Sequence, residues 1–195
     1  MLVVGLTGSI GMGKSAVAAR LRALGIPVCD ADAEVHRLYE GAAVPAIEAA
    51  FPGTTAGGKV DRQKLAAVLL QRPQDFARLE AIVHPLVLAA ERAFLRDAAA
   101  RGAALAVLEV PLLFETGMEG AFDVVVCVVA PDGDREGRAD GTGLAALEGR
   151  ESRQLTQDDK AARASHVISN DGTLADLDEK VADLVGELAS SGGGD

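Results

Sequence analysis

The stretch that decides the fold is Gly8-Ser9-Ile10-Gly11-Met12-Gly13-Lys14-Ser15, which matches the pattern G-x-x-x-x-G-K-[ST]. It follows the apolar run Leu2 to Leu6, which predicts a strand, and it precedes Val17, Leu21 and Leu24, which recur at helical spacing. In such a strand, loop and helix, the glycines let backbone N–H groups converge on a phosphate, and the helix adds the positive end of its dipole. The sequence therefore predicts a phosphate-binding loop, or P-loop.

The residues of this loop have separate predicted roles in binding ATP and Mg²⁺. Lys14 is expected to reach the β- and γ-phosphates, and the Ser15 hydroxyl is expected to bind Mg²⁺. Contacts to the nucleotide are assigned to the whole loop and the start of the helix, namely Gly8, Gly11, Met12, Gly13, Lys14, Ser15 and Ala16.

Length and charge limit the classes of protein that this chain can represent. With 195 residues, 49% of them apolar, we expect one α/β domain with inserted segments. A formal net charge of −10 argues against a general binder of nucleic acid or anionic membranes, since both partners require a basic surface. The N-terminal apolar run is too short for a signal peptide or a membrane span, so we expect a cytoplasmic protein. Cys29 and Cys127 lie in apolar stretches without metal-ligand spacing and are interpreted as small buried hydrophobes.

Acidic residues follow two further predicted strands. The strand Ile26 to Cys29 ends in Asp30-Ala31-Asp32, and the strand Leu105 to Val110 has Glu109 near its end. In an open parallel sheet these carboxylates lie at the same edge as the P-loop. Asp30 or Asp32 can supply a base for an acceptor hydroxyl, or can merely cap the next helix. Glu109 can orient Mg²⁺ or its water, or can be an ordinary charge at a strand end.

A block without alternating strands lies between these two strands and predicts a helical insertion in the α/β core. Residues 41–60 are irregular in pattern, and Asp61 is expected to cap a helix. Further helices are predicted over about 74–83 and 86–101, with a break at His84-Pro85.

The C-terminal part contains two more predicted strands, over 123–130 and 166–168, and a closing helix over 174–188 with a disordered tail at 190–195. Between the strands, residues 132–160 are rich in charge and glycine and are interpreted as a mobile segment. The arginines of this segment, Arg135 and Arg138 among them, can close over ATP and stabilise the transferring phosphoryl group, or can be solvated surface residues.

Several motifs together resemble one family, dephospho-coenzyme A kinase, over most of the chain. The P-loop with the preceding Gly5-Leu6-Thr7 looks like that of the family, and Val28-Cys29-Asp30-Ala31-Asp32 looks like its D-A-D segment. The more discriminating motifs are Asp61-Arg62 with Leu65, Leu79-Glu80-Ala81-Ile82-Val83-His84-Pro85, and Val110-Pro111-Leu112-Leu113-Phe114-Glu115.

The resemblance implies a three-layer P-loop kinase fold with a five-stranded parallel sheet, an inserted helical coenzyme A-binding region at about 33–95 and a lid at about 132–160. It implies transfer of the ATP γ-phosphoryl group to the 3′-hydroxyl of the ribose in dephospho-coenzyme A. Asp32 is then the candidate base, and Asn170 is expected near the adenine. The other residues that the resemblance assigns to substrate or catalysis are Arg62, His84, Leu112 and the lid residues Arg135 and Arg138.

The chain departs from the family pattern in the lid and in the loop. Its lid motif, Pro131 to Arg138, is shortened and lacks the glutamine of the family. In the P-loop, Met12 replaces a small residue and is expected to point outward.

Three alternatives stay open at this level. Another P-loop kinase of a small hydroxyl compound would give no reason for the helical block with Asp61-Arg62 and His84-Pro85. A regulatory GTP switch would require an N-K-x-D motif, which the sequence lacks. A catalytically impaired family member that still binds coenzyme A and ATP is suggested by the shortened lid. The sequence carries no signal for an oligomeric state.

Overall fold

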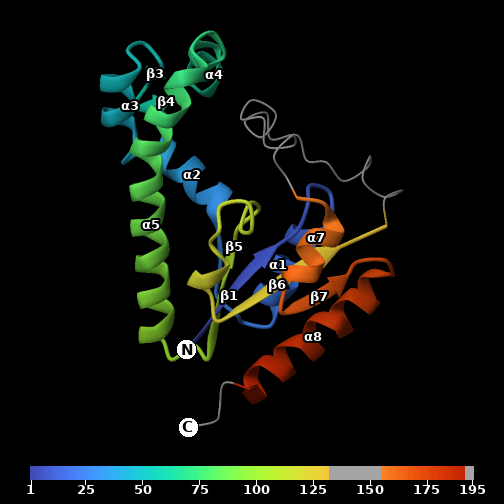
Figure 1. Ribbon diagram of the computed structural model, residues 1–195. Coiled ribbons are helices and arrows are strands. Elements are labelled where there is room, and N and C mark those ends of the chain that lie inside the picture. Colours follow the sequence, from blue (N-terminus) through green and yellow to red (C-terminus); the bar gives the residue numbers. More distant parts are fainter. Residues whose placement is uncertain (132–154, 192–195) are drawn as a thin grey trace. The chain divides into compact units, whose positions relative to one another are not determined.

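The computed structural model describes residues 1–131 and 155–191 (Figure 1). These residues form two compact units, one made of 1–29, 95–131 and 155–191, and the other of 30–94. The lid candidates Arg135 and Arg138 lie outside the described residues. None of the helices in the described part combines the length and the apolarity needed to cross a bilayer.

A five-stranded parallel sheet in the order β2-β5-β1-β6-β7 confirms the predicted fold class. Its strands are continuous apolar runs, as expected where helices cover both faces of a sheet. They are β1 (Leu2–Thr7), β2 (Val28–Asp30), β5 (Leu105–Glu109), β6 (Val124–Val129) and β7 (His166–Ser169). Because the first strand in the sequence is central, the P-loop leaves the sheet in the middle of its carboxyl edge.

Helices of the first unit pack on both faces of this sheet. On one face, α1 (Lys14–Ala23) and α8 (Leu174–Ser191) cover alternate residues of β1 and β6, Val4 and Val126 among them. On the other face, Leu113 of the turn after β5 packs with Val125 of β6 and with Leu155 and Ala164, which flank α7 (Gln157–Arg163). A short 3₁₀ turn, η2 (Glu119–Ala121), precedes β6. Helices, sheet and helices therefore form three layers.

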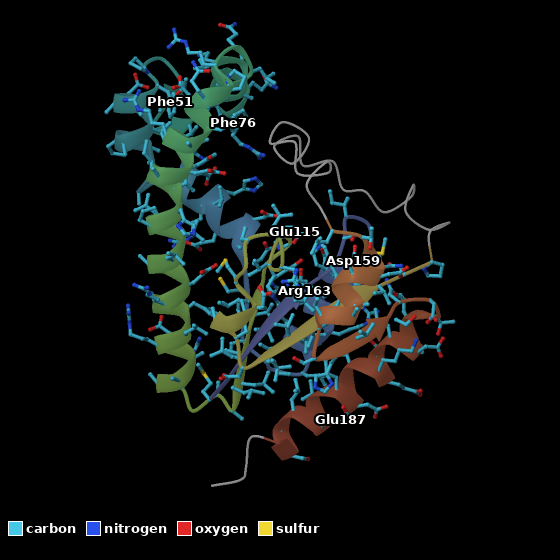
Figure 2. All side chains as sticks on the ribbon, viewed as in Figure 1. Phe51, Phe76, Glu115, Asp159, Arg163 and Glu187 are labelled. Atoms are coloured by element: carbon cyan, nitrogen blue, oxygen red, sulfur yellow. The ribbon has the colours of Figure 1, made fainter. Side chains whose placement is uncertain are left out.

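The second unit is mostly helical and has its own apolar core. Phe51 belongs to this core together with Leu38, Ile47 and Leu79, and the partly buried Phe76 packs against it; both phenylalanines are labelled in Figure 2. Its elements are α2 (Ala31–Tyr39), α3 (Val44–Ala50), the hairpin β3 (Thr55–Ala56) and β4 (Lys59–Val60), α4 (Arg62–Gln71), η1 (Pro73–Asp75) and most of α5 (Phe76–Ala100).

Three local predictions were wrong. Residues 41–60 contain α3 and a hairpin, because Pro45 lies in the first turn of a helix, where its missing N–H is harmless. The predicted break at Pro85 is absent from α5, since Pro85 and Ala81 are exposed and the unpaired carbonyl of Ala81 can face water. Finally, α8 continues through Ser191, whereas the sequence placed the tail from residue 190.

Candidate active site

The P-loop joins the end of β1 to the start of α1. Gly13 caps α1 in a left-handed conformation, with φ of +89°, and no side chain caps the helix there. The first N–H groups of α1 therefore meet no side-chain acceptor at the cap, which is the arrangement that binds anions at helix N-termini. Gly8 approaches the neighbouring strand so closely that a Cβ would lie 2.5 Å from the Val128 carbonyl oxygen. Glycine is thus required at both ends of the loop.

Lys14 lies over the loop that it follows. Its Nζ donates hydrogen bonds to the carbonyl oxygens of Gly8, at 3.0 Å, and Ser9, at 3.4 Å. The ammonium group therefore lies against the backbone of the first two residues of the loop. The neighbouring Ser15 is exposed, as a metal-binding hydroxyl must be.

Asn170, directly after β7, contacts the same loop. Its side-chain amide donates to the Met12 carbonyl oxygen at 3.1 Å, and a Cβ on Gly13 would lie 2.1 Å from Asn170 Nδ2. Asn170 is 7% exposed. The Asn170 side chain thus braces the P-loop backbone, a contact that its predicted place near adenine did not include.

The outward orientation expected for Met12 was wrong. Its side chain is 0% exposed and packs in the core between the sheet and α1. A flexible, unbranched thioether can fill such an irregular space, so the methionine fits where a small residue was expected.

Two further candidates lie at the end of β5, the neighbour of β1. Glu109 is buried at the last position of the strand, in register with Leu6. Leu112 lies in the turn that follows, and its carbonyl oxygen accepts hydrogen bonds from the backbone and the hydroxyl of Thr116. The first unit therefore brings the P-loop, Glu109, Leu112 and Asn170 to the carboxyl edge of one sheet.

The two aspartates after β2 have different roles. Asp30 Oδ1 accepts hydrogen bonds from the backbone N–H groups of Asp32, at 2.9 Å, and Ala33, at 3.0 Å. Asp30 is therefore the N-cap of α2, and the capping interpretation holds for it. Asp32 lies in the first turn of the same helix and is half-buried.

The substrate candidates Arg62 and His84 lie in the helical unit. Arg62 begins α4, and its Nε is buried without a hydrogen-bond partner among the described residues. His84 is exposed on α5 and influences Glu91, one of the few buried carboxylates of the described residues. Burial raises the pKa of Glu91, the His84 charge opposes this shift, and Glu34 adds to it.

Cys127, on β6, is buried and is a poor nucleophile. Burial raises the pKa of Cys127 to about 11, although the charges of Lys160 and Lys14 oppose that shift. Cys127 is a free thiol. The interpretation of Cys127 as a small buried hydrophobe is confirmed, whereas Cys29 is only partly buried.

The sequence analysis did not predict the ion pair between Lys160 and Glu115. Lys160 was assigned to a mobile segment, but it lies on α7 with a side chain that is 0% exposed and 2.9 Å from Glu115. The helix itself had a signal, because Thr156 caps it and Thr156-x-x-Asp159 is typical of a helix start. No local signal indicates that Lys160 is buried.

Comparison with known proteins assigns the family. The family model described as dephospho-CoA kinase matches residues 2–176. The dephospho-CoA kinase of Rhodopseudomonas palustris is 50% identical over 177 residues, which are 89% of each chain. That of Agrobacterium fabrum is 45% identical and covers 97% of this chain and 100% of the relative.

Solved structures share the fold of this chain. TT1252 from Thermus thermophilus has a TM-score of 0.77 at 37% identity, covering 96% of this chain and 97% of its own. The dephospho-CoA kinase from Campylobacter jejuni shares the fold, with a TM-score of 0.72 at 22% identity over 97% of this chain and 98% of its own. The P-loop lies at the centre of a parallel sheet, the family model matches most of the chain, and the relatives named above are all dephospho-CoA kinases. The chain therefore belongs to the dephospho-CoA kinase family.

Proposed function

We propose that this protein transfers the γ-phosphoryl group of ATP to the 3′-hydroxyl of the ribose in dephospho-coenzyme A, giving coenzyme A and ADP. The observation that carries the proposal is the P-loop with the Lys14 ammonium group bound to its backbone carbonyls, in a chain that belongs to the dephospho-CoA kinase family. Because the chain belongs to this family, dephospho-coenzyme A is favoured as the acceptor over other small hydroxyl compounds such as shikimate. Membership also disfavours a regulatory GTP switch.

The loop binds the phosphates in this proposal. Its N–H groups and the start of α1 hold the β-phosphate, while Lys14 exchanges its hydrogen bonds to Gly8 and Ser9 for bonds to the β- and γ-phosphates. The strongly acidic chain thereby supplies positive charge only where the transferring group develops negative charge. Arg135 and Arg138 remain proposed contributors of the same kind.

Mg²⁺ fits the residues at this edge of the sheet. The Ser15 hydroxyl and the Glu109 carboxylate are oxygen donors, which Mg²⁺ prefers, and kinases commonly hold it with one or two protein groups and substrate phosphates. The described residues contain no cluster of three His, Cys, Asp or Glu side chains able to hold a metal, so the proposal relies on Ser15, Glu109 and the phosphates of the substrate. When bound, the ion would neutralise charge on the phosphates.

Asp32 is the proposed base for the 3′-hydroxyl. Asp30 Oδ1 caps α2, whereas Asp32 lies half-buried in the first turn of that helix, and the assignment of the base to Asp32 comes from the D-A-D segment of the family. A positioned base contributes about 10²- to 10⁴-fold to such a reaction.

The coenzyme A portion is proposed to bind the helical unit. The buried Nε of Arg62, which has no hydrogen-bond partner in the described part of the chain, suits an anionic group of the substrate. His84 and Leu112 are the other proposed contacts. We also propose that the protein acts in the cytoplasm, as a kinase of coenzyme A synthesis that uses ATP.

A coupled assay of ADP release tests this function. Dephospho-coenzyme A is compared with adenosine and shikimate as acceptors, with MgCl₂ present or replaced by EDTA. The expected result is acceptor-dependent ADP release with dephospho-coenzyme A alone, abolished by EDTA. ADP release with shikimate or adenosine would show that the acceptor is a compound other than dephospho-coenzyme A. ATP binding without any acceptor-dependent release would identify an impaired family member.

A further inference from the structure

A fully buried lysine lies in the same unit as the P-loop. Lys160, on α7, has the largest fully buried side chain among the described residues. Its Nζ lies 2.9 Å from Oε1 of Glu115, whose side chain is 8% exposed and is labelled in Figure 2. Lysine is almost never fully buried unless it is paired, because burying a charge costs free energy. The burial of Lys160 therefore needs an explanation.

Hydrogen bonds connect this ion pair to the start of the P-loop. Lys160 Nζ also donates to the Pro111 carbonyl oxygen at 3.2 Å, and the same oxygen accepts the Thr7 hydroxyl at 3.3 Å. Thr7 is buried at the last position of β1, directly before the loop. On the other side, Glu115 Oε1 accepts the backbone N–H of Leu155 at 3.0 Å. The pair thus ties the turn after β5 to the P-loop and to the segment that leads into α7.

Stability alone does not account for the pair. Removing two charges from water costs several kcal/mol per ion, and well-packed apolar side chains of similar volume often stabilise a fold as well or better. In addition, Glu115 Oε2 is buried without a hydrogen-bond partner among the described residues. An apolar pair could not reproduce the two hydrogen bonds to the backbone, in which Lys160 donates to the Pro111 carbonyl and Glu115 accepts from the Leu155 N–H.

We propose that Lys160 and Glu115 are positioning residues for phosphoryl transfer. The ion pair holds the Pro111 carbonyl where it accepts the Thr7 hydroxyl, and so fixes the first residues of the P-loop and the turn that continues from Glu109. This inference rests on the proposed function, since the position of the loop limits the rate only if the loop aligns a reacting phosphate. In such reactions a misplacement of about 1 Å can lower the rate about 100-fold.

The test replaces both charges by apolar side chains in the full-length protein, as Glu115→Leu/Lys160→Met. We expect a melting temperature close to that of the wild type, a kcat lowered about tenfold or more, and a Kd for ADP changed less than about threefold, because the loop's own N–H groups and Lys14 remain. Hydrogen exchange of the backbone amides in residues 2–15, followed by mass spectrometry, should become faster. This readout does not depend on turnover.

The partly exposed ion pair of Arg163 and Glu119 is the matched control, because Arg163 lies on the same helix. Arg163→Met/Glu119→Gln should change neither kcat nor the exchange of residues 2–15. If the double variant at Glu115 and Lys160 melts like the wild type and keeps wild-type kcat and exchange, the pair is merely structural and the proposal is overturned.

A second variant keeps the proposal testable if the double variant does not fold. Thr7→Val removes only the hydroxyl that reaches Pro111 and leaves the ion pair intact. It should fold and show a kcat lowered by about three- to tenfold with faster exchange in residues 2–15, since one hydrogen bond contributes about 1 kcal/mol. Wild-type kcat and exchange in Thr7→Val would also overturn the proposal. If the wild-type protein releases no acceptor-dependent ADP, the proposed function fails, whereas the exchange experiment still decides whether the pair positions the loop.

Discussion

The side-chain amide of Asn170 donates a hydrogen bond to the backbone carbonyl of Met12 across 158 positions of the sequence. The bond joins the end of β7 to the P-loop, so the C-terminal part of the chain supports a site built at its N-terminus. Asn170 is buried and lies against Gly13, which leaves no room for a side chain at position 13.

Loss of this brace should weaken nucleotide binding. Asn170→Asp keeps the shape of the side chain but replaces the donor by an oxygen that faces the Met12 carbonyl. Because one hydrogen bond contributes about 1 kcal/mol, we expect the Kd for ADP to rise about fivefold or more, measured by calorimetry. A Kd equal to that of the wild type would show that the brace does not support the loop.

Gly13→Ala should damage the loop more severely than a strained backbone alone. The substitution adds a Cβ at φ of +89° and places it 2.1 Å from Asn170 Nδ2. Gly25→Ala is the matched control, because Gly25 has a similar φ of +79° and open space around its Cβ position. Both variants should lose about 1–3 kcal/mol of stability from the backbone strain, measured by urea denaturation. Only Gly13→Ala should also lose ADP affinity, and equal affinity in the two variants would contradict the clash.

Lys14→Met should nearly abolish turnover. The methionine keeps the length of the side chain but removes the ammonium group that lies over the Gly8 and Ser9 carbonyls. Removing one group that stabilises charge in a transition state lowers rates by about 10²- to 10³-fold, so we expect at least that loss in kcat for ADP release. Lys59→Met serves as control, since the exposed Lys59–Glu40 pair contributes little. Turnover within tenfold of the wild type would remove Lys14 from the mechanism.

Asp30 and Asp32 should separate stability from catalysis. Asp30→Ala removes the N-cap of α2 and should lower the free energy of unfolding by about 1 kcal/mol, measured by urea denaturation. Asp32→Asn should leave that free energy nearly unchanged and lower kcat by about 10²-fold or more, because it removes the proposed base. Full turnover in Asp32→Asn would assign the proton transfer to another group.

The parts of the fold that the sequence predicted are those set by local pattern. The glycine spacing and Lys14 indicate a P-loop because the backbone conformation of a few neighbouring residues decides it. The strands β5 and β6 are continuous apolar runs, which indicate a buried parallel sheet without knowledge of their partners. From these two signals the carboxyl edge of the sheet, and with it the place of Glu109, could be predicted.

The features that the sequence missed depend on distant partners. Lys160 is buried because Glu115 and Pro111 contact it from the turn after β5, whereas the two residues that precede it, Asp158 and Asp159, are charged and indicate an exposed segment. The bond from Asn170 to Met12 likewise exists only after β7 has joined the sheet. Pro85 lies within α5 on its exposed face. Which face is exposed depends on how the second unit packs, and the sequence around the proline does not show it.

Glu91 should make the stability of the protein depend on pH. Burial raises the pKa of this carboxyl above its ordinary value of 4.5, with Glu34 on α2 adding to the shift and His84 on α5 opposing it. The folded protein therefore binds the proton of Glu91 more tightly than the unfolded chain does. The stability that this group contributes is fully present below about pH 4.5 and is lost as the pH rises through the raised pKa.

Glu91→Gln removes the buried charge and keeps the shape of the side chain. We expect the variant to melt at a higher temperature than the wild type at pH 8, and the difference to shrink as the pH falls toward 4.5, followed by calorimetry at several pH values. Glu80→Gln, on the exposed side of the same helix, is the matched control for removing a carboxylate from α5. A difference in melting temperature that stays constant over this range would show that Glu91 does not bind its proton more tightly in the folded protein than in the unfolded chain.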